Sequence, residues 1–316
     1  MNILEIKDLN MGFRFERGFQ PVLYDISLSL KKKSTLAIVG ESGSGKTLTA
    51  MSVLRLLPKN ALITGGEINY GSHNLLNKCE KDMQKIRGKK IALIPQDPMS
   101  SLNPLYTVGN QLLEVIELHQ GLTGEEAKKV AIDALKQVKI PNAEQRMNAY
   151  PHEFSGGMKQ RVIIAMALAC QADIILADEP TTALDVTVQA QIMKLLQEIK
   201  ENHSTSIILI THDLGLVAEN ADEIAVMYAG RIVEYSQNSE LFKNPKHPYT
   251  KALLKAVPDV HAGSLEIIEG QPPSISDEIP GCRFHPRCKN RIDRCSKEIP
   301  CLEEINTKSK AACFNR

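Results

Sequence analysis

The sequence has few aromatic residues and almost no net charge. Its 316 residues include no tryptophan, seven tyrosines and seven phenylalanines, and the formal net charge at pH 7 is +1. Nucleic-acid binding depends on a basic face or on aromatic rings that stack on bases, and this composition offers neither. We therefore expect no nucleic acid among the partners of this protein.

Long apolar runs and export signals are also missing. No apolar run approaches the length of a membrane span, and residues 162–170 form one of the longest. Residues 1–5 lack the basic start and apolar core of a secretion signal. We expect a soluble cytosolic protein, and its length favours a large core domain with an appendage.

A complete phosphate-binding loop of the form G-x-x-x-x-G-K-[ST] occupies residues 40–47. It follows the apolar run 35–39, which predicts a buried strand, and precedes residues 48–57, which predict a helix. Glycines in such a loop let backbone N–H groups surround phosphate oxygens, so the sequence predicts a nucleoside triphosphate site. Lys46 is expected to reach the β- and γ-phosphates, and the Thr47 hydroxyl a Mg²⁺ ion.

Three further apolar runs each end in polar side chains suited to phosphate chemistry: residues 91–95 before Gln96, 173–177 before Asp178 and Glu179, and 206–210 before His212. Fully apolar runs that alternate with helical segments predict a mostly parallel sheet flanked by helices. Ligands of such sheets bind at the carboxyl ends of the strands. We therefore expect these polar residues to converge on the nucleotide.

Each of the four polar residues has a distinct expected role. Asp178 has the position of a carboxylate that holds Mg²⁺, directly or through water. Glu179 is suited to act as a general base on the attacking water. Gln96 offers an uncharged oxygen for Mg²⁺ or that water, and His212 can donate a hydrogen bond to the γ-phosphate.

A second glycine pair predicts another anion-binding helix start. Residues 154–161 read F-S-G-G-M-K-Q-R, in which Ser155 is a good N-cap and Gly156 and Gly157 leave backbone N–H groups open. This string, together with the phosphate loop and the acidic pair 178–179, closely resembles the ATP-binding subunits of ATP-binding-cassette (ABC) proteins. The resemblance covers roughly residues 4–233.

The resemblance implies an α/β fold, the P-loop NTPase cassette of ABC proteins. Such a cassette has a mostly parallel sheet with flanking helices, an N-terminal antiparallel β part and a helical subdomain. The implied division is an ATP-binding domain over residues 1–235, with the helical subdomain at about 97–160, and a cysteine-rich extension over residues 236–316. Helical spacing at residues 108–119 and 125–139 agrees with that subdomain. In the family it receives the coupling helices of the transporter, and residues 97–104 are a candidate hinge.

The resemblance also assigns roles residue by residue. It implies catalytic roles for Lys46, Gln96, Glu179 and His212, and Mg²⁺ binding by Thr47, Gln96 and Asp178. It implies nucleotide contacts from Phe13, Gly40, Ser42, Gly43, Ser44, Gly45, Lys46, Thr47, Thr49, Gln96 and Asp178. In ABC proteins the signature loop of one cassette caps the nucleotide of another, so Ser155, Gly156 and Gly157 are expected to act on the ATP of a partner. Residues 183–185, with Asp185, match the loop that crosses that interface.

The C-terminal extension narrows the resemblance to one branch of the family. Residues 247–254, 269–273 and 281–288 resemble the extension of ATPase subunits from dipeptide and oligopeptide importers, a group that includes nickel importers. This implies three kinds of partner: a homologous ATPase subunit, in a heterodimer, two transmembrane permease subunits and an extracytoplasmic solute-binding protein. The implied location is the cytoplasmic face of the cell membrane.

Five of the seven cysteines lie in the last 35 residues, between Cys282 and Cys313. The gaps in Cys282-x5-Cys288-x6-Cys295-x17-Cys313 are wider than those of most structural zinc modules. Several members of the family carry a [4Fe–4S] cluster on this pattern, which implies these four cysteines as ligands, with Cys301 as the alternative to Cys313 for the fourth position. Nine Lys and Arg against four Asp and Glu in residues 282–316 would offset an anionic cluster. Zn²⁺ and free thiols remain alternatives.

These features predict an ATPase subunit that powers the import of short peptides. One alternative is the same machinery importing nickel or another small solute. A second is a non-transport ABC ATPase acting on DNA or ribosomes, but the chain has one phosphate loop and no strongly basic character. A third is a redox sensor in which the cysteines gate ATP hydrolysis.

Overall fold

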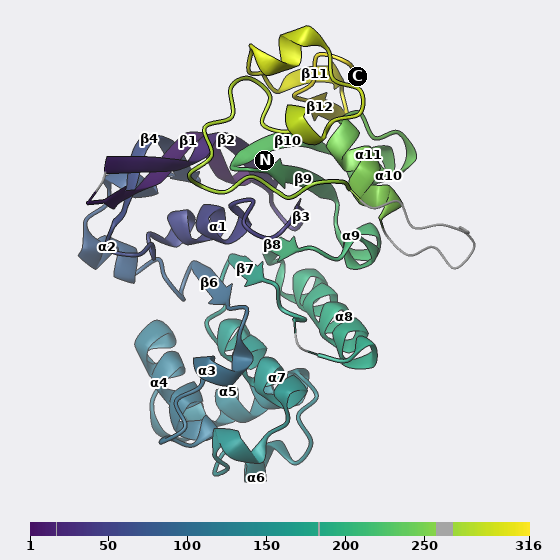
Figure 1. Cartoon of the computed structure of the whole chain (residues 1–316). Coiled ribbons are helices and arrows are strands. Elements are labelled where there is room, and N and C mark those ends of the chain that lie inside the picture. Colours follow the sequence, from purple (N-terminus) through teal and green to yellow (C-terminus); the bar gives the residue numbers. More distant parts are fainter. Residues whose placement is uncertain (17, 183, 257–267) are drawn as a thin grey trace. The chain divides into compact units, whose positions relative to one another are not determined.

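The computed structural model describes residues 1–16, 18–182, 184–256 and 268–316 (Figure 1). It divides into two compact units, and each is described by itself. The first unit comprises Met1–Lys31, Thr35–Asn77 and Ile210–Arg316, and the second comprises Lys32–Ser34 and Lys78–Leu209. None of the helices in the described ranges combines the length and apolar character needed to cross a bilayer.

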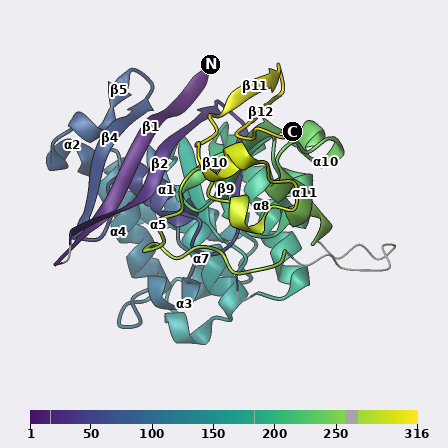
Figure 2. The same cartoon turned by 45° about the horizontal axis from the view of Figure 1, so that its top comes forward.

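The first unit contains an antiparallel sheet built from the N-terminal part of the chain. Its strand order is β2 (Gly18–Lys31), β1 (Asn2–Phe15), β4 (Ala61–Tyr70) and β5 (His73–Asn74). Figure 2 shows the long strands β1, β2 and β4 side by side. Alternate apolar side chains of β1 and β2 are buried, the pattern of a sheet with one face on a core. The expected N-terminal antiparallel part is confirmed.

A second set of strands in this unit surrounds the phosphate loop. Strand β3 (Thr35–Val39) pairs in parallel with β9 (Glu223–Tyr228), and β9 pairs antiparallel with β10 (Arg231–Gln237). The sheet continues through β12 (Ser309–Ala311) to β11 (Glu303–Asn306), so the C-terminal extension adds strands to it. The helical elements of the unit are α1 (Lys46–Leu54), η1 (Leu75–Asn77), α9 (Leu214–Asn220), α10 (Asn238–Lys243), α11 (Pro248–Lys255), η3 (His285–Arg287) and η4 (Asp293–Ser296).

The second unit combines parallel strands with a helical region. Strand β6 (Ile91–Ile94) pairs in parallel with β7 (Ile174–Asp178), and β8 (Ser206–Thr211) begins in this unit. The helices are α2 (Glu80–Gln84), α3 (Pro98–Ser101), α4 (Val108–Gln120), α5 (Gly124–Gln137), α6 (Ala143–Arg146), η2 (Pro151–Glu153), α7 (Gly156–Ala169) and α8 (Val186–His203). Figure 1 shows α4, α5 and α7 gathered together, and their apolar faces are buried. The mixed sheet, the flanking helices and the helical region confirm the expected fold class.

One local prediction was wrong in detail, and one stays a prediction. The helix expected over residues 48–57 spans Lys46–Leu54. It starts earlier because Gly45 adopts a left-handed conformation at the N-cap, and it ends earlier because Arg55 is also left-handed, with φ 53°. The candidate hinge at residues 97–104 contains the one-turn helix α3, whose N-cap Asp97 accepts a hydrogen bond from the Met99 N–H.

The start of α11 depends on a histidine that is buried in its neutral form. The His247 side chain is 1% exposed, and its Nδ1 accepts the N–H of Tyr249 at 3.1 Å, which caps the helix. Burial, with a smaller contribution from the charge of Lys251, lowers the pKa of His247 from 6.5 to about 3. Below about pH 6.5 the unfolded chain binds a proton at this residue and the folded chain does not. The stabilisation is therefore present above pH 6.5 and is lost progressively as the pH falls toward 3.

We expect His247→Asn to remove this loss, because asparagine keeps an N-cap acceptor and does not titrate in this range. Relative to that variant, the parental protein should lose about 2 kcal/mol of unfolding free energy between pH 7 and pH 5. Urea denaturation at both pH values measures the difference. Parallel pH profiles for the two proteins would contradict the assignment.

Candidate functional site

The phosphate loop connects β3 to α1 in the first unit, as the sequence predicts. A Cβ atom at Gly40 would lie 2.2 Å from the Met227 carbonyl oxygen, and one at Gly45 would lie 2.6 Å from Leu23 Cδ2. Gly45 also has φ 103°, and Gly43 has φ 77° with open space around it. These positions require glycine either for close packing against β9 and β2 or for left-handed backbone.

Lys46 lies over the loop rather than in solvent. Its side chain is almost fully buried, and Nζ donates hydrogen bonds to the carbonyl oxygens of Gly40, at 2.8 Å, and Glu41, at 3.0 Å. Thr49 holds the first turn of α1 by donating from Oγ1 to the Gly45 carbonyl at 3.0 Å. Ser42 and Thr47 are exposed at the loop. The loop thus presents a cation and a helix N-terminus to the same region.

The loop also contains a buried polar atom without a protein partner. Ser44 Oγ is buried, and among the residues that the structure describes it has no hydrogen-bond partner. A buried hydroxyl without a partner costs free energy, and a phosphate oxygen is a ligand that relieves the cost. Together with Lys46 and the backbone N–H groups of the loop, Ser44 fits a bound polyphosphate.

In the second unit, the structure brings Gln96 and Glu179 together. Because β6 and β7 are parallel, the residues that follow them lie at the same edge, and Gln96 Nε2 donates to Glu179 Oε2 at 2.9 Å. Thr182 Oγ1 donates to the same oxygen at 2.9 Å. Asp178, the last residue of β7, is buried. These two strand ends therefore meet, as expected, and their convergence on the nucleotide stays a prediction.

Glu179 has an uncommon backbone conformation. Its φ is 46°, in the left-handed region that residues with a Cβ atom rarely adopt. Left-handed residues of this kind are often found at functional sites, where the surrounding structure holds them in place. The turn places the carboxylate in a half-buried position beside Gln96 and Thr182.

The glycine-rich string at residue 155 forms the start of α7, as predicted. Ser155 is the N-cap, and its side chain accepts the N–H of Met158 at 3.3 Å. A Cβ atom at Gly157 would lie 2.8 Å from Val188 Cγ1, so a glycine there lets α7 approach α8 closely. Asp185 is the N-cap of α8 and accepts the N–H of Val188 at 2.9 Å. Gly156 begins α7, and Ala183 lies outside the described residues.

His212 and Phe13 lie in the first unit. His212 is exposed and follows β8, just before the N-cap of α9. Phe13 is half-buried near the end of β1, and its ring centroid lies 6.1 Å from that of Phe15. Phe15 is about half exposed, so both rings remain candidates for an adenine contact. The role of Phe13 stays a prediction.

Four of the five cysteines of the extension lie close to one another: Cys282, Cys288, Cys295 and Cys313. Burial raises the pKa of Cys282 to about 11, and the thiols of Cys295, Cys313 and Cys288 add to the rise. Burial and neighbouring thiols of this same set also raise the pKa of Cys288 and of Cys313. Cys301 is exposed. Over the described part of the chain, no group of three or more His, Cys, Asp or Glu side chains has the spacing of a metal site. The expected iron–sulfur or zinc site is therefore not confirmed, although the donor set is one that either group uses.

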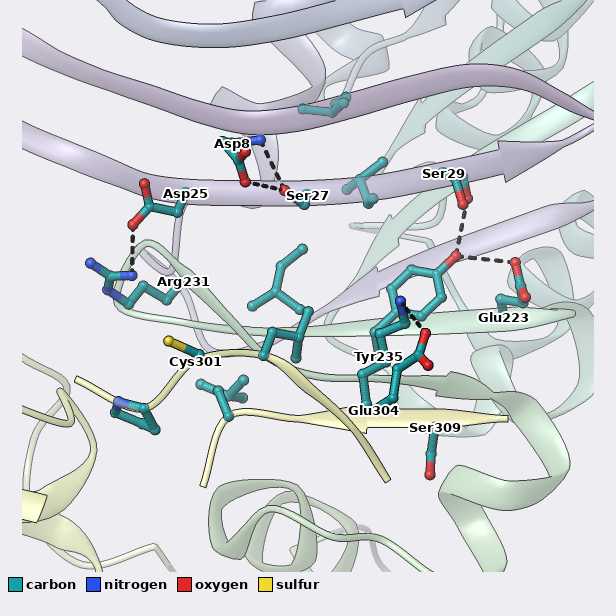
Figure 3. A pocket seen from close by; sticks show the side chains of 18 of the residues that line it. Asp8, Asp25, Ser27, Ser29, Glu223, Arg231, Tyr235, Cys301, Glu304 and Ser309 are labelled. Carbon is teal, nitrogen blue, oxygen red and sulfur yellow. Dashed lines mark hydrogen bonds and ion pairs between the residues drawn. The ribbon is translucent and has the colours of Figure 1, made fainter. Parts of the chain in front are cut away.

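A cavity of about 900 Å³ lies where the extension meets β1, β2 and β10 (Figure 3). Polar groups in it bond to one another: Arg231 to the Asp25 carboxylate at 3.1 Å and Ser27 to the Asp8 carboxylate at 2.9 Å. The Tyr235 hydroxyl bonds the Ser29 backbone carbonyl at 3.0 Å and the Glu223 carboxylate at 3.1 Å. Of the described residues predicted to bind nucleotide, none lines it. The cavity is a seam between the extension and the sheets rather than the nucleotide site.

Two protein families match the chain, in different segments. Residues 23–182 match the family described as ABC transporter, and residues 233–295 match the family described as oligopeptide/dipeptide transporter, C-terminal region. The first match contains the phosphate loop, Gln96, the string at 155–157 and the pair Asp178 and Glu179. The second lies within the part of the chain predicted to be the extension, apart from its first three residues.

Curated relatives align over nearly the whole chain. The oligopeptide transport ATP-binding protein OppD of Escherichia coli is 47% identical over 314 residues, covering 99% of this chain and 93% of the relative. The dipeptide transport ATP-binding protein DppD of Bacillus subtilis is 46% identical over 301 residues, covering 94% and 90%.

Solved structures share the cassette part of the fold. The dimeric structure of MJ0796, described as a bacterial ABC transporter cassette, has a TM-score of 0.67 and 28% identity, covering 74% of this chain and 98% of that one. A post-hydrolysis state of MJ0796 bound to ADP and Pi has a TM-score of 0.66 and also covers 74% of this chain and 98% of that one.

Proposed function

This chain belongs to the ABC transporter ATP-binding proteins, in their oligopeptide and dipeptide branch, and we propose that it hydrolyses ATP to power the import of short peptides. The assignment to peptide import depends on one observation. The segment that matches the oligopeptide and dipeptide C-terminal region belongs to the same compact unit as a complete phosphate loop. We assign residues 1–235 to the ATP-binding domain, about 97–160 to its helical subdomain and 236–316 to the extension.

The phosphate loop would hold the triphosphate through its backbone N–H groups, Ser44 and Lys46. Lys46 is already dehydrated, so its charge would act on phosphate oxygens with little screening. Thr47, Asp178 and Gln96 are the oxygen donors proposed for Mg²⁺. That ion would neutralise charge on the β- and γ-phosphates during transfer.

Glu179 is the proposed general base that takes a proton from the attacking water. Hydrogen bonds from Gln96 and Thr182 to its Oε2 hold the carboxylate in place at the strand ends, where it would orient the attacking water. Gln96 is the proposed link to Mg²⁺, and His212 the proposed donor to the γ-phosphate. These roles are inferred from motif and chemistry for each residue.

ATP binding is proposed to close two cassettes on each other. Ser155, Gly156 and Gly157 would cap the nucleotide of the partner, with Asp185 at the interface. The dimeric state of the related MJ0796 cassette supports this arrangement. We propose a heterodimer with a homologous ATPase subunit, bound to two permease subunits through residues 97–160. This chain would lie at the cytoplasmic face of the membrane. An extracytoplasmic solute-binding protein would deliver the solute to the complex from the other side.

Cys282, Cys288, Cys295 and Cys313 are the proposed ligands of a [4Fe–4S] cluster, with Zn²⁺ as the alternative. The proximity of these four thiols and the exposure of Cys301 support this choice of four. A cluster or zinc ion would supply a cross-link that stabilises a segment with little core of its own. The basic residues of the segment would offset the charge of the thiolates.

The test is a reconstituted complex. The chain is co-expressed with permease subunits and a homologous ATPase subunit from the same genome, purified in lipid nanodiscs and assayed for ATP hydrolysis with the solute-binding protein. We expect short peptides to stimulate hydrolysis severalfold and unrelated sugars to have no effect. Stimulation by nickel alone would identify the nickel branch instead. Failure of the chain to join any permease would refute the transport function.

A further inference from the structure

Glu41, the second residue of the phosphate loop, is held by the C-terminal extension at both its backbone and its side chain. Its N–H donates to the Tyr249 hydroxyl at 2.9 Å. Its carboxylate accepts two hydrogen bonds from Arg287, at 2.7 and 3.1 Å. Its carbonyl oxygen accepts from Lys46 Nζ at 3.0 Å. Glu41 therefore connects the extension to the lysine expected to bind phosphate.

Arg287 is fixed in one orientation by further contacts. Its side chain is 7% exposed, and that of Glu41 is 23% exposed. The remaining N–H groups of Arg287 donate to the Tyr228 hydroxyl at 3.3 Å and to the carbonyl oxygens of Glu269, at 3.0 Å, and Ile268, at 3.4 Å. A two-pronged arginine–carboxylate pair with little solvent access is among the stronger and more directional polar contacts in proteins.

Aromatic packing anchors both contacts to the cysteine-rich segment. The ring of Phe284, which lies in the chain between Cys282 and Cys288, is 5.1 Å from the ring of Tyr228 and 5.3 Å from that of Tyr249, centroid to centroid. The two tyrosine rings are 4.7 Å apart, and all three side chains are buried. Burial raises the pKa of Tyr249, so its hydroxyl stays protonated and neutral at physiological pH.

We propose that Arg287 and Tyr249 prepare the phosphate loop for ATP: Tyr249 positions the backbone of Glu41, and Arg287 acts mainly by neutralising the Glu41 carboxylate that would otherwise repel the triphosphate. The inference rests on the proposed function and extends it, because it gives the extension a role at the nucleotide site. Tyr249 fixes the backbone at the start of the loop. Arg287 fixes the side chain and cancels its charge.

Because Glu41 is charged, the proposal predicts opposite changes in ATP affinity when Arg287 is removed alone and when Glu41 is then removed as well. A carboxylate beside the phosphate loop repels a triphosphate, and Arg287 offsets that repulsion. Removing Arg287 alone should therefore weaken ATP binding, whereas removing both charges should restore it. A purely structural role for Arg287 predicts no such recovery, because the second substitution cannot replace lost packing.

The experiment measures Kd for ATP by calorimetry and KM and kcat for hydrolysis on the full chain in its complex. We expect Arg287→Gln to raise Kd and KM roughly tenfold while kcat at saturating ATP stays within about twofold. The double variant Glu41→Gln with Arg287→Gln should return to within about twofold of the parental Kd. A double variant as weak as Arg287→Gln alone, or an unchanged Kd in Arg287→Gln, would overturn the proposal.

A matched control separates the loop contact from general damage to the extension. Arg294 lies in the same cysteine-rich segment, bonds Glu298 at 2.8 Å and stacks over Phe314 at 4.1 Å. Arg294→Gln should leave Kd within about twofold. An equal rise in Kd for Arg294→Gln and Arg287→Gln would assign the effect to the segment as a whole and refute a specific contact.

The tyrosine provides a second variant that preserves packing. Tyr249→Phe removes only the hydroxyl that accepts the Glu41 N–H, and should raise Kd about fivefold. The control is Tyr235→Phe, because the Tyr235 hydroxyl bonds the Ser29 backbone carbonyl and the Glu223 carboxylate and makes no contact with the phosphate loop. Equal Kd values for Tyr249→Phe and the parental chain would remove Tyr249 from the proposal.

These outcomes are distinct from a failure of the proposed function. If the parental chain binds no ATP, the function itself is wrong. If the parental chain binds ATP and the Arg287 and Tyr249 variants bind it equally well, only the role of these two residues in preparing the loop is wrong.

Discussion

Glu179→Gln should bind ATP with nearly parental affinity and hydrolyse it roughly 10³-fold more slowly. Glutamine has the same shape as glutamate, and its carbonyl oxygen can still accept the hydrogen bonds that Gln96 and Thr182 donate to Oε2. It cannot take a proton from water. The substitution therefore separates the binding of ATP from its hydrolysis. Steady-state phosphate release and nucleotide calorimetry on the same preparation measure the two quantities.

The control for this variant is Asp173→Asn. Asp173 immediately precedes the same strand at its other end and forms an ion pair with Lys90 at 3.1 Å, where both side chains are well exposed. An exposed pair of this kind contributes little to stability, so the rate should stay within about twofold. Hydrolysis by Glu179→Gln at the parental rate would show that another group activates the water.

The second large effect is expected from Gly40→Ala, which should lose ATP binding by roughly 100-fold or more. The new methyl group would lie 2.2 Å from the Met227 carbonyl oxygen, a backbone atom of β9, so the loop has to move away from the strand. That movement displaces the carbonyl oxygens of Gly40 and Glu41, which accept the hydrogen bonds of Lys46 Nζ. We also expect a loss of about 3 kcal/mol in the free energy of unfolding.

Gly71→Ala tests whether backbone strain alone explains such a result. Gly71 has φ 57°, and nothing lies within 4 Å of the position of its Cβ atom, so alanine there introduces strain without a clash. ATP affinity should be unchanged and the stability loss near 1 kcal/mol. Thermal unfolding and nucleotide titration compare the two alanine variants. Parental affinity in Gly40→Ala would mean that the loop tolerates displacement from β9.

Local signals in the sequence were sufficient for many parts of the fold. The apolar run at residues 35–39 correctly predicted a buried strand, and the capping preference of serine correctly predicted the helix start at Ser155. The pairing of Gln96 with Glu179 follows from two parallel strands whose apolar runs end at the same edge. In each case a few adjacent residues determine the outcome.

Contacts between distant segments could not be predicted in this way. Glu41 and Arg287 are 246 positions apart, and neither residue is unusual in its local pattern. The buried Glu234 is similar, since it accepts the N–H groups of Lys246 and His247, both at 2.8 Å. The sequence predicts a carboxylate within a strand, but it does not show that a distant turn supplies the backbone N–H groups that bond to this carboxylate. The helix end predicted at residue 57 was wrong, because the helix ends at Leu54, where a left-handed arginine rather than a glycine or proline follows it.

The pairing of β12 with β10 has a consequence for synthesis on the ribosome. Strand β10 follows β9 directly, but its other neighbour consists of residues 309–311, which are made more than 70 residues later. Until then β10 is an edge with unpaired backbone groups, a surface that favours aggregation. A nascent chain cut short before residue 303 retains every nucleotide motif and exposes that edge, so it should accumulate as insoluble material.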